Sequence, residues 1–187
     1  MDELQDMFRQ GVESSFRNIY KKFKDNYIEM TLKDGHAEPL ILVLELDDGV
    51  IMSNPEPLRN KEGDLRKIAK RYAKKVVREQ THLPVGVILA TEAWYKAIAK
   101  DEKYDGLTDK QGNPKQGVRD ALVISGMTCT RQSEVNVYEM IEQDNKIIDL
   151  VQFNEGQAEP FVLVEFYEML RKEIEQEEKK YGHQAKG

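Results

Sequence analysis

Residues 121–153 read ALVISGMTCTRQSEVNVYEMIEQDNKIIDLVQF. This stretch contains three apolar-rich arms, 121–128, 134–141 and 147–153. The arms are separated by polar residues of the types that form tight turns, at 130–132 and 143–145. Each arm has the length of an ordinary strand. The pattern therefore predicts a β-meander of consecutive antiparallel strands in the second half of the chain.

The first half of the chain contains further strand signals. Residues 40–44 are continuously apolar, which is typical of a central strand covered on both faces. Asp47-Asp48-Gly49 is a turn signal, and residues 50–52 would be the returning arm of a hairpin. We expect Asn54-Pro55-Glu56-Pro57 to end that arm, because proline has no amide hydrogen to donate to a ladder. Residues 85–90 are rich in β-branched side chains and indicate a buried strand.

Several segments have the apolar spacing of amphipathic helices. The amino-terminal one ends either at Asp25-Asn26 or at Gly35, since glycine readily takes the left-handed conformation after a helix. The second covers residues 62–79, where apolar side chains recur every three or four positions. The last opens at Pro160, which the first turn of a helix tolerates, and we expect the charged tail 175–187 to fray.

Strands and helices that do not alternate regularly favour the α+β class. We predict a mainly antiparallel sheet that includes the C-terminal β-meander, with about three helices packed against it. A doubly wound parallel sheet is the alternative. The 187 residues suit one domain, 1–187, and are short for two. Within it, 101–118 carries turn signals without periodicity and is expected to be a long polar loop.

Composition narrows the class and the compartment. A hydrophobic content of 40% with 33% charged residues is typical of folded, soluble proteins. No apolar run is long enough to cross a bilayer, so we expect no membrane partner. The amino end is acidic, unlike a secretory signal, and the lone Cys129 has no internal disulfide partner. We therefore expect a cytoplasmic protein.

The helix expected at 62–79 has a basic face along 61–78. This face is either an anion-binding surface, with nucleic acid as one partner, or an ordinary solvated helix face. We favour the second interpretation, because the net charge of -6 opposes charge-driven attraction to nucleic acid and no aromatic residue lies on the basic face, Tyr72 being part of the apolar stripe. The candidate anion-binding residues are Lys67, Lys70, Lys74 and Arg78.

The sequence lacks the motifs that usually identify an enzyme. It contains no GxxxxGK[ST] loop, GxGxxG, HExxH, GxSxG or CxxC pattern. The three histidines, His36, His82 and His183, are far apart in the chain, so we predict no metal site and no cofactor. Cys129 lies near Arg131, and we interpret it as a small residue at a strand end.

The candidate binding residues lie on both sides of the long loop. They are Glu92, Trp94, Arg119 and Asp120. The two carboxylates would serve as an acid and a base, or hold a divalent cation, if the strands brought them together. We favour the alternatives, in which Arg119 pairs with Glu92 and Trp94 is a core anchor. Residues 91–100 are compatible with a strand or a helix.

An apolar strand ending in Glu92-Ala93-Trp94, followed after a variable loop by residues 119–126 (RDALVISG), resembles a group of small, uncharacterised bacterial and phage proteins. The likeness covers about the middle third of the chain, and its motifs are short. It implies a strand around Glu92, and it carries no assigned activity. The charged insert at 101–116 is longer than the resemblance leads us to expect.

Two functional hypotheses follow. The favoured one is a non-catalytic interaction or accessory protein with a protein partner, and a homo-oligomer is left open. The alternative is an enzyme acting on a phosphorylated or nucleotide-like substrate, with Glu92 and Asp120 as metal or acid–base groups and Arg119 or the basic helix as anion binder.

Overall fold

The computed structural model describes residues 2–47, 50–95, 106–156 and 161–184. In this part of the chain, three helices accompany six strands, and the strands form one sheet in the order β2-β1-β3-β4-β5-β6. Every neighbouring pair of strands is antiparallel. The predicted α+β class with an antiparallel sheet is confirmed. The elements are α1 (Asp2–Asp34), β1 (Leu40–Asp47), β2 (Val50–Pro57), α2 (Lys61–Arg78), β3 (Gly86–Tyr95), β4 (Arg119–Thr128), β5 (Ser133–Gln143), β6 (Lys146–Gly156) and α3 (Phe161–Gln184).

The predicted β-meander is present as β4, β5 and β6. Asp144 and Asn145 connect β5 to β6, and both have positive φ, 53° and 60°. This is the backbone of the tight two-residue turn that matches the twist of a hairpin, and asparagine and aspartate tolerate it well. The turn predicted at residues 143–145 therefore follows from local side-chain chemistry.

The prediction that Asn54-Pro55-Glu56-Pro57 ends the second strand is wrong, because β2 continues through Pro57. It pairs with β1 on one side only and is an edge of the sheet. An edge strand tolerates proline, since the side of the strand that faces no neighbour needs no amide donor. The sequence left residues 91–100 open between a strand and a helix. Residues 91–95 belong to strand β3, and 96–100 lie outside the described residues.

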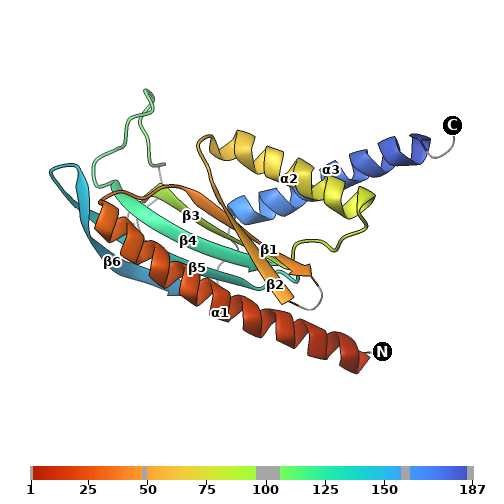
Figure 1. The fold of residues 1–187 in the computed structure, drawn as a ribbon. Helices are drawn as coiled ribbons and strands as arrows, with labels where there is room; N and C mark the ends of the chain where they lie inside the picture. Colours follow the sequence, from red (N-terminus) through yellow and green to blue (C-terminus); the bar gives the residue numbers. More distant parts are fainter. Residues whose placement is uncertain (1, 48–49, 96–105, 157–160, 185–187) are drawn as a thin grey trace.

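Helix α1 covers one face of the sheet, whereas α2 and α3 lie together on the other (Figure 1). The side chains of β1 alternate accordingly: Leu42 and Leu44 join the core under α1, and Ile41 and Val43 join the core under α2 and α3. All four are buried, which explains the continuous apolar run predicted to be a central strand.

Helix α1 ends at Asp34, and Gly35 follows with φ of 74°, so the later of the two predicted ends is correct. Its aromatic side chains lie unusually close to the sheet. A Cβ atom added to Gly126 would lie 2.8 Å from Phe16 Cζ and 2.8 Å from Tyr20 Cδ2, and one added to Gly86 would lie 3.0 Å from Phe16 Cδ2. Glycine on neighbouring strands therefore lets α1 pack directly on the backbone of the sheet.

Helix α3 continues to Gln184, so the helix does not end near Glu175 as the expected fraying implied. It packs along α2, and Arg78 Nε of α2 lies 2.6 Å from the buried carboxylate of Glu177 on α3. This contact between helices extends order into a segment whose composition alone is that of a solvated tail. Residues 185–187 lie outside the described part of the chain.

Residues 106–118, the described part of the expected long loop, are built around Asp109. Its Oδ1 atom accepts hydrogen bonds from the backbone amides of Gln111 and Asn113, at 2.8 and 2.9 Å, and Thr108 forms a bridge with Pro114. Residues 101–105 lie outside the described residues.

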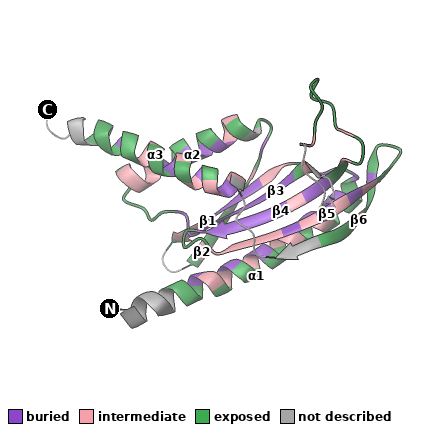
Figure 2. Cartoon of the chain, turned by 180° about the vertical axis from the view of Figure 1, so that it is seen from behind, coloured by how far each residue is buried: buried purple, intermediate pink, exposed green. Residues whose placement is uncertain are grey.

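Strands β5 and β6 extend past the two helices on the α2–α3 face (Figure 2). Ile148, Val151 and Phe153 of β6 are 53%, 47% and 47% exposed. The edge strand β6 therefore carries three apolar side chains that are open to solvent among the residues that the structure describes.

Candidate functional site

The strand register separates the residues that the sequence suggested as one site. Glu92 pairs with Leu122, whose side chain belongs to the core under α1, so Glu92 and the alternating Asp120 lie on the α1 face. Arg119 is next to Asp120 along β4 and therefore lies on the opposite face. The backbone of Trp94 pairs with that of Asp120, while the side chain of Trp94 is outside the described residues.

The predicted pairing of Arg119 with Glu92 is wrong. Arg119 Nη1 forms an ion pair with the carboxylate of Glu139, which lies one strand further on β5. The physical reason is the two-residue period of a strand, which places consecutive side chains on opposite faces. Glu139 pairs in register with Ala121 and so shares a face with Arg119, whereas Glu92 does not.

The two carboxylates of the predicted acid–base pair do influence each other. Burial raises the pKa of Glu92, and the negative charges of Asp120 and Glu142 raise it further, against a smaller opposite effect of His36. The grouping is acidic, and Arg119, one of the two anion binders that the enzyme hypothesis named, lies on the other face of the sheet. Among the described residues, no cluster of histidine, cysteine, aspartate and glutamate has the arrangement of a metal site.

The basic face of α2 is largely neutralised by acidic side chains. Lys67 Nζ lies 3.2 Å from Asp64 Oδ1, Lys70 Nζ lies 4.0 Å from Glu173 Oε1, and Arg78 is paired with Glu177. Lys74 has no ion-pair partner in the described part of the chain. Three of the four candidate anion-binding residues are thus engaged within the protein, which favours the interpretation of a structural helix face.

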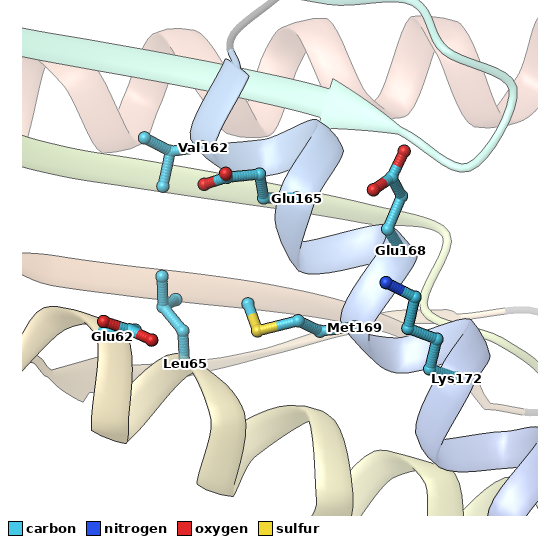
Figure 3. A pocket seen from close by; sticks show the side chains of 7 residues that line it. All are labelled: Glu62, Leu65, Val162, Glu165, Glu168, Met169 and Lys172. Atoms are coloured by element: carbon cyan, nitrogen blue, oxygen red, sulfur yellow. The ribbon is translucent and has the colours of Figure 1, made fainter.

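A more distinctive feature lies between α2 and α3 and encloses about 580 Å³. We call it the α2–α3 cleft (Figure 3). Leu65 of α2 and Met169 of α3 point toward one another across it and form an apolar floor. Its lining residues are Glu62, Leu65, Val162, Glu165, Glu168, Met169 and Lys172.

The charges of the α2–α3 cleft are unbalanced: three carboxylates face one amine. Glu62 lies 3.6 Å from Arg66 and is partly compensated. Glu165 and Glu168 have no ion-pair partner within the described residues. The cleft therefore combines an apolar floor with an acidic rim, which is the arrangement that attracts a cationic, partly apolar ligand.

Sequence reasoning did not identify this cleft. Glu165, Glu168 and Lys172 are spaced three and four residues apart, as on any solvated helix face, and Met169 continues the buried stripe of α3. The one sequence signal for the cleft was Met169 directly after Glu168, at the boundary between the apolar and polar faces of α3. Only the position of α2 shows that this boundary borders a cleft.

Comparison with known proteins found no matching family model, no matching curated protein and no matching solved structure. Among the described helices, none is long and apolar enough to span a membrane.

Proposed function

We propose that this chain is a non-catalytic interaction protein that binds, in the α2–α3 cleft, a segment of a partner protein in which cationic side chains flank an apolar one. The observation that carries the proposal is the composition of the cleft. Leu65 and Met169 provide an apolar floor, and Glu165 and Glu168 provide carboxylates without a partner in the described structure. A cytoplasmic location, self-association and a link to phage proteins stay predictions.

The charge of the cleft decides the class of partner. Nucleic acid and anionic lipid carry negative charge and would be repelled by the rim, whereas a lysine- or arginine-containing peptide is attracted to it. The apolar floor adds hydrophobic contact that a purely polar ligand would not use. A cationic amphipathic segment is the ligand that satisfies both parts of the surface.

The positions of the predicted acidic residues argue against the enzyme hypothesis. Glu92 and Asp120 lie on the α1 face, whereas both candidate anion binders lie on the other face, namely the basic helix α2 and Arg119, whose guanidinium is paired with Glu139. A phosphorylated substrate would meet two carboxylates without that guanidinium. The described arrangement therefore favours binding over phosphate chemistry.

The test uses a fluorescein-labelled peptide in which lysine residues flank leucine residues. The peptide is titrated with the full chain, and binding is followed by fluorescence anisotropy. We expect it to bind at low salt, and we expect the double variant Glu165→Lys/Glu168→Lys to weaken binding by about tenfold, because each exposed charge contact is worth about 0.2–1 kcal/mol and reversal adds repulsion. Met169→Ser should weaken binding through the apolar floor.

The matched control is Glu175→Lys/Glu178→Lys, which makes the same change of net charge on the same helix outside the cleft. This variant should retain most of the affinity. An equal loss in both double variants would mean that the peptide responds only to the overall charge of the protein, and it would refute the assignment of the cleft.

A further inference from the structure

A second cavity, of about 410 Å³, lies between α3 and the turn that connects β4 to β5. We call it the Cys129 cavity, after the cysteine on its wall. Its apolar walls come from the end of β4, from α3 and from the segment before β3; they are Leu83, Met127, Val164, Leu170 and Ile174. This volume lies within the range of about 300–1,000 Å³ that is usual for small-molecule sites.

Two guanidinium groups line the Cys129 cavity, from Arg131 and Arg171, against one lining carboxylate, that of Glu168. Arg171 Nε also lies 3.3 Å from Oε1 of Glu175, which is not a lining residue. The sign of the charge is therefore opposite to that of the α2–α3 cleft, although Glu168 borders both. Guanidinium groups recognise carboxylates through paired N–H donors. The cavity thus offers apolar contact and anion recognition side by side.

Arg131 occupies a backbone position that favours glycine. Its φ is 66°, and its amide donates a 3.0 Å hydrogen bond to the carbonyl of Thr128 within the β4–β5 turn. Residues other than glycine, asparagine and aspartate are strained in this region, so the turn alone gives no reason for an arginine. The strain and the position of the side chain on the cavity wall together point to a role for the guanidinium group.

We propose that the Cys129 cavity binds a small apolar carboxylate, whose hydrocarbon part contacts the apolar walls and whose carboxylate meets Arg131 and Arg171. The site is separate from the α2–α3 cleft in its charge and in all its lining residues except Glu168. The protein would then bind a small molecule as well as a partner. This proposal does not depend on the proposed binding of a partner peptide.

Cys129 provides a direct reporter of occupancy, because it is the only cysteine of the chain and its side chain is exposed. Partial burial raises the pKa of its thiol, so alkylation by iodoacetamide is best followed at a pH of about 8.5 or above, where the thiolate is more abundant. The rate of alkylation is measured by intact mass in the presence of octanoate, octan-1-ol or acetate, with the full chain.

We expect octanoate to slow alkylation, by about tenfold when it is present at ten times its dissociation constant, because the occupied site shields the thiol. Acetate lacks the apolar part, and octan-1-ol lacks the charge, so both should protect weakly at the same concentration. Octyl phosphate is a further arm: stronger protection than by octanoate would reassign the site to phosphates and overturn the choice of a carboxylate.

The decisive variant is Arg131→Gly, which removes the guanidinium group while glycine keeps the turn without strain. Protection by octanoate should be lost in this variant. The control is Lys172→Gln, which removes a positive charge from α3 at a residue that lines the α2–α3 cleft and not this cavity. It should leave the protection unchanged.

The proposal is overturned if octanoate gives no protection, if octan-1-ol protects equally well, or if Arg131→Gly retains the effect. Isothermal titration calorimetry of octanoate with the unmodified protein checks that protection reflects binding. Because the peptide experiment uses other variants and another readout, failure of one proposal is distinguishable from failure of the other.

Discussion

Helices α1 and α3 contact opposite faces of the same sheet in different ways. Helix α1 places the rings of Phe16 and Tyr20 directly on the glycines of β3 and β4, so close that a single added Cβ would overlap them. Helix α3 lies over the end of β4 and leaves the Cys129 cavity beside it. The contrast is local to β3 and β4, where α1 is packed on the glycines and α3 leaves a cavity. Against β1 and β2, α1 also borders a cavity, of about 390 Å³.

The hydrogen bonds of two tyrosine hydroxyl groups, one on each face of the sheet, also differ. Under α1, Tyr20 Oη donates a 2.7 Å hydrogen bond to the carbonyl of Ile124 and accepts one of 2.9 Å from Asn136 Nδ2, in the buried core. On the other side, Tyr167 Oη donates a longer bond, of 3.3 Å, to the carbonyl of Met127 next to the cavity. Substitutions matched across the two faces test whether this difference has energetic consequences.

The largest effect is expected for Gly126→Ala. The new methyl group would lie 2.8 Å from atoms of both Phe16 and Tyr20, so α1 must move or its rings must leave their rotamers. We expect the free energy of unfolding to fall by about 2–3 kcal/mol, as in other overpacked cores. Urea denaturation followed by circular dichroism measures the change.

Gly11→Ala on α1 is the matched control for that substitution. No atom lies within 4 Å of a Cβ added there, and alanine favours a helix over glycine by about 0.5–1 kcal/mol. This variant should therefore be slightly more stable than the unmodified protein. A small effect of Gly126→Ala would show that the contact between α1 and the sheet is looser than the distances indicate.

Tyr20→Phe should cost about 1–2 kcal/mol, because it leaves the carbonyl of Ile124 and the amide of Asn136 without this partner in a buried site. Tyr167→Phe is the comparison on the other face, and we expect a loss of less than about 1 kcal/mol, since its hydrogen bond is longer. If both variants lost the same free energy of unfolding, the hydrogen bonds on the two faces would contribute equally to stability, and the proposed difference between the faces would be refuted.

The sequence predicted the individual helices, strands and turns better than it predicted which of them lie side by side. The turn at Asp144 and Asn145 was predictable because these residues themselves favour positive φ. The end of β2 was not, because whether Pro55 and Pro57 are tolerated depends on β2 being an edge strand, which is a property of the whole sheet. The close approach of α1 to Gly126 likewise depends on Phe16 and Tyr20, which lie more than a hundred residues away in the chain.

The candidate site was less predictable for the same reason. The sequence placed Glu92, Asp120 and Arg119 near the ends of neighbouring strands, which is correct, but the register that assigns Arg119 to the other face is not visible in it. The partners of the basic helix are also distant in sequence: Lys70 lies near Glu173, and Arg78 pairs with Glu177. The sequence shows which charged residues lie on one face of a helix, but it does not show which charged residues of other elements lie opposite them.

A smaller effect, of opposite sign, is expected at the β4–β5 turn. Arg131→Gly should raise the free energy of unfolding by about 0.5–1 kcal/mol relative to Arg131→Ala, because glycine takes the φ of 66° without the strain that alanine has there. Both variants lose the guanidinium group, so their difference isolates the backbone. If the two variants were equally stable, the turn would not be strained, and the argument that Arg131 is retained for its side chain would lose its support.

The smallest effect is expected for Glu92→Gln, and it concerns pH. Burial and the charges of Asp120 and Glu142 raise the pKa of Glu92 in the folded protein, so the folded state holds this proton more tightly than the unfolded state does. The contribution to stability is present below the unfolded pKa and is lost as the pH rises through the folded one. Glu92→Gln should therefore flatten the fall in stability between the ordinary glutamate range and neutral pH.

Glu139→Gln is the control for that measurement, because the carboxylate of Glu139 is paired with Arg119 on the other face of the same strands. Losing this ion pair should lower stability near neutral pH, whereas Glu92→Gln should preserve or raise it there, since it removes a repelled charge. The two variants thus change stability in opposite directions at one pH. If both lowered it, Glu92 would have a favourable partner in the folded state, and the acidic grouping on the α1 face would need a cation to explain it.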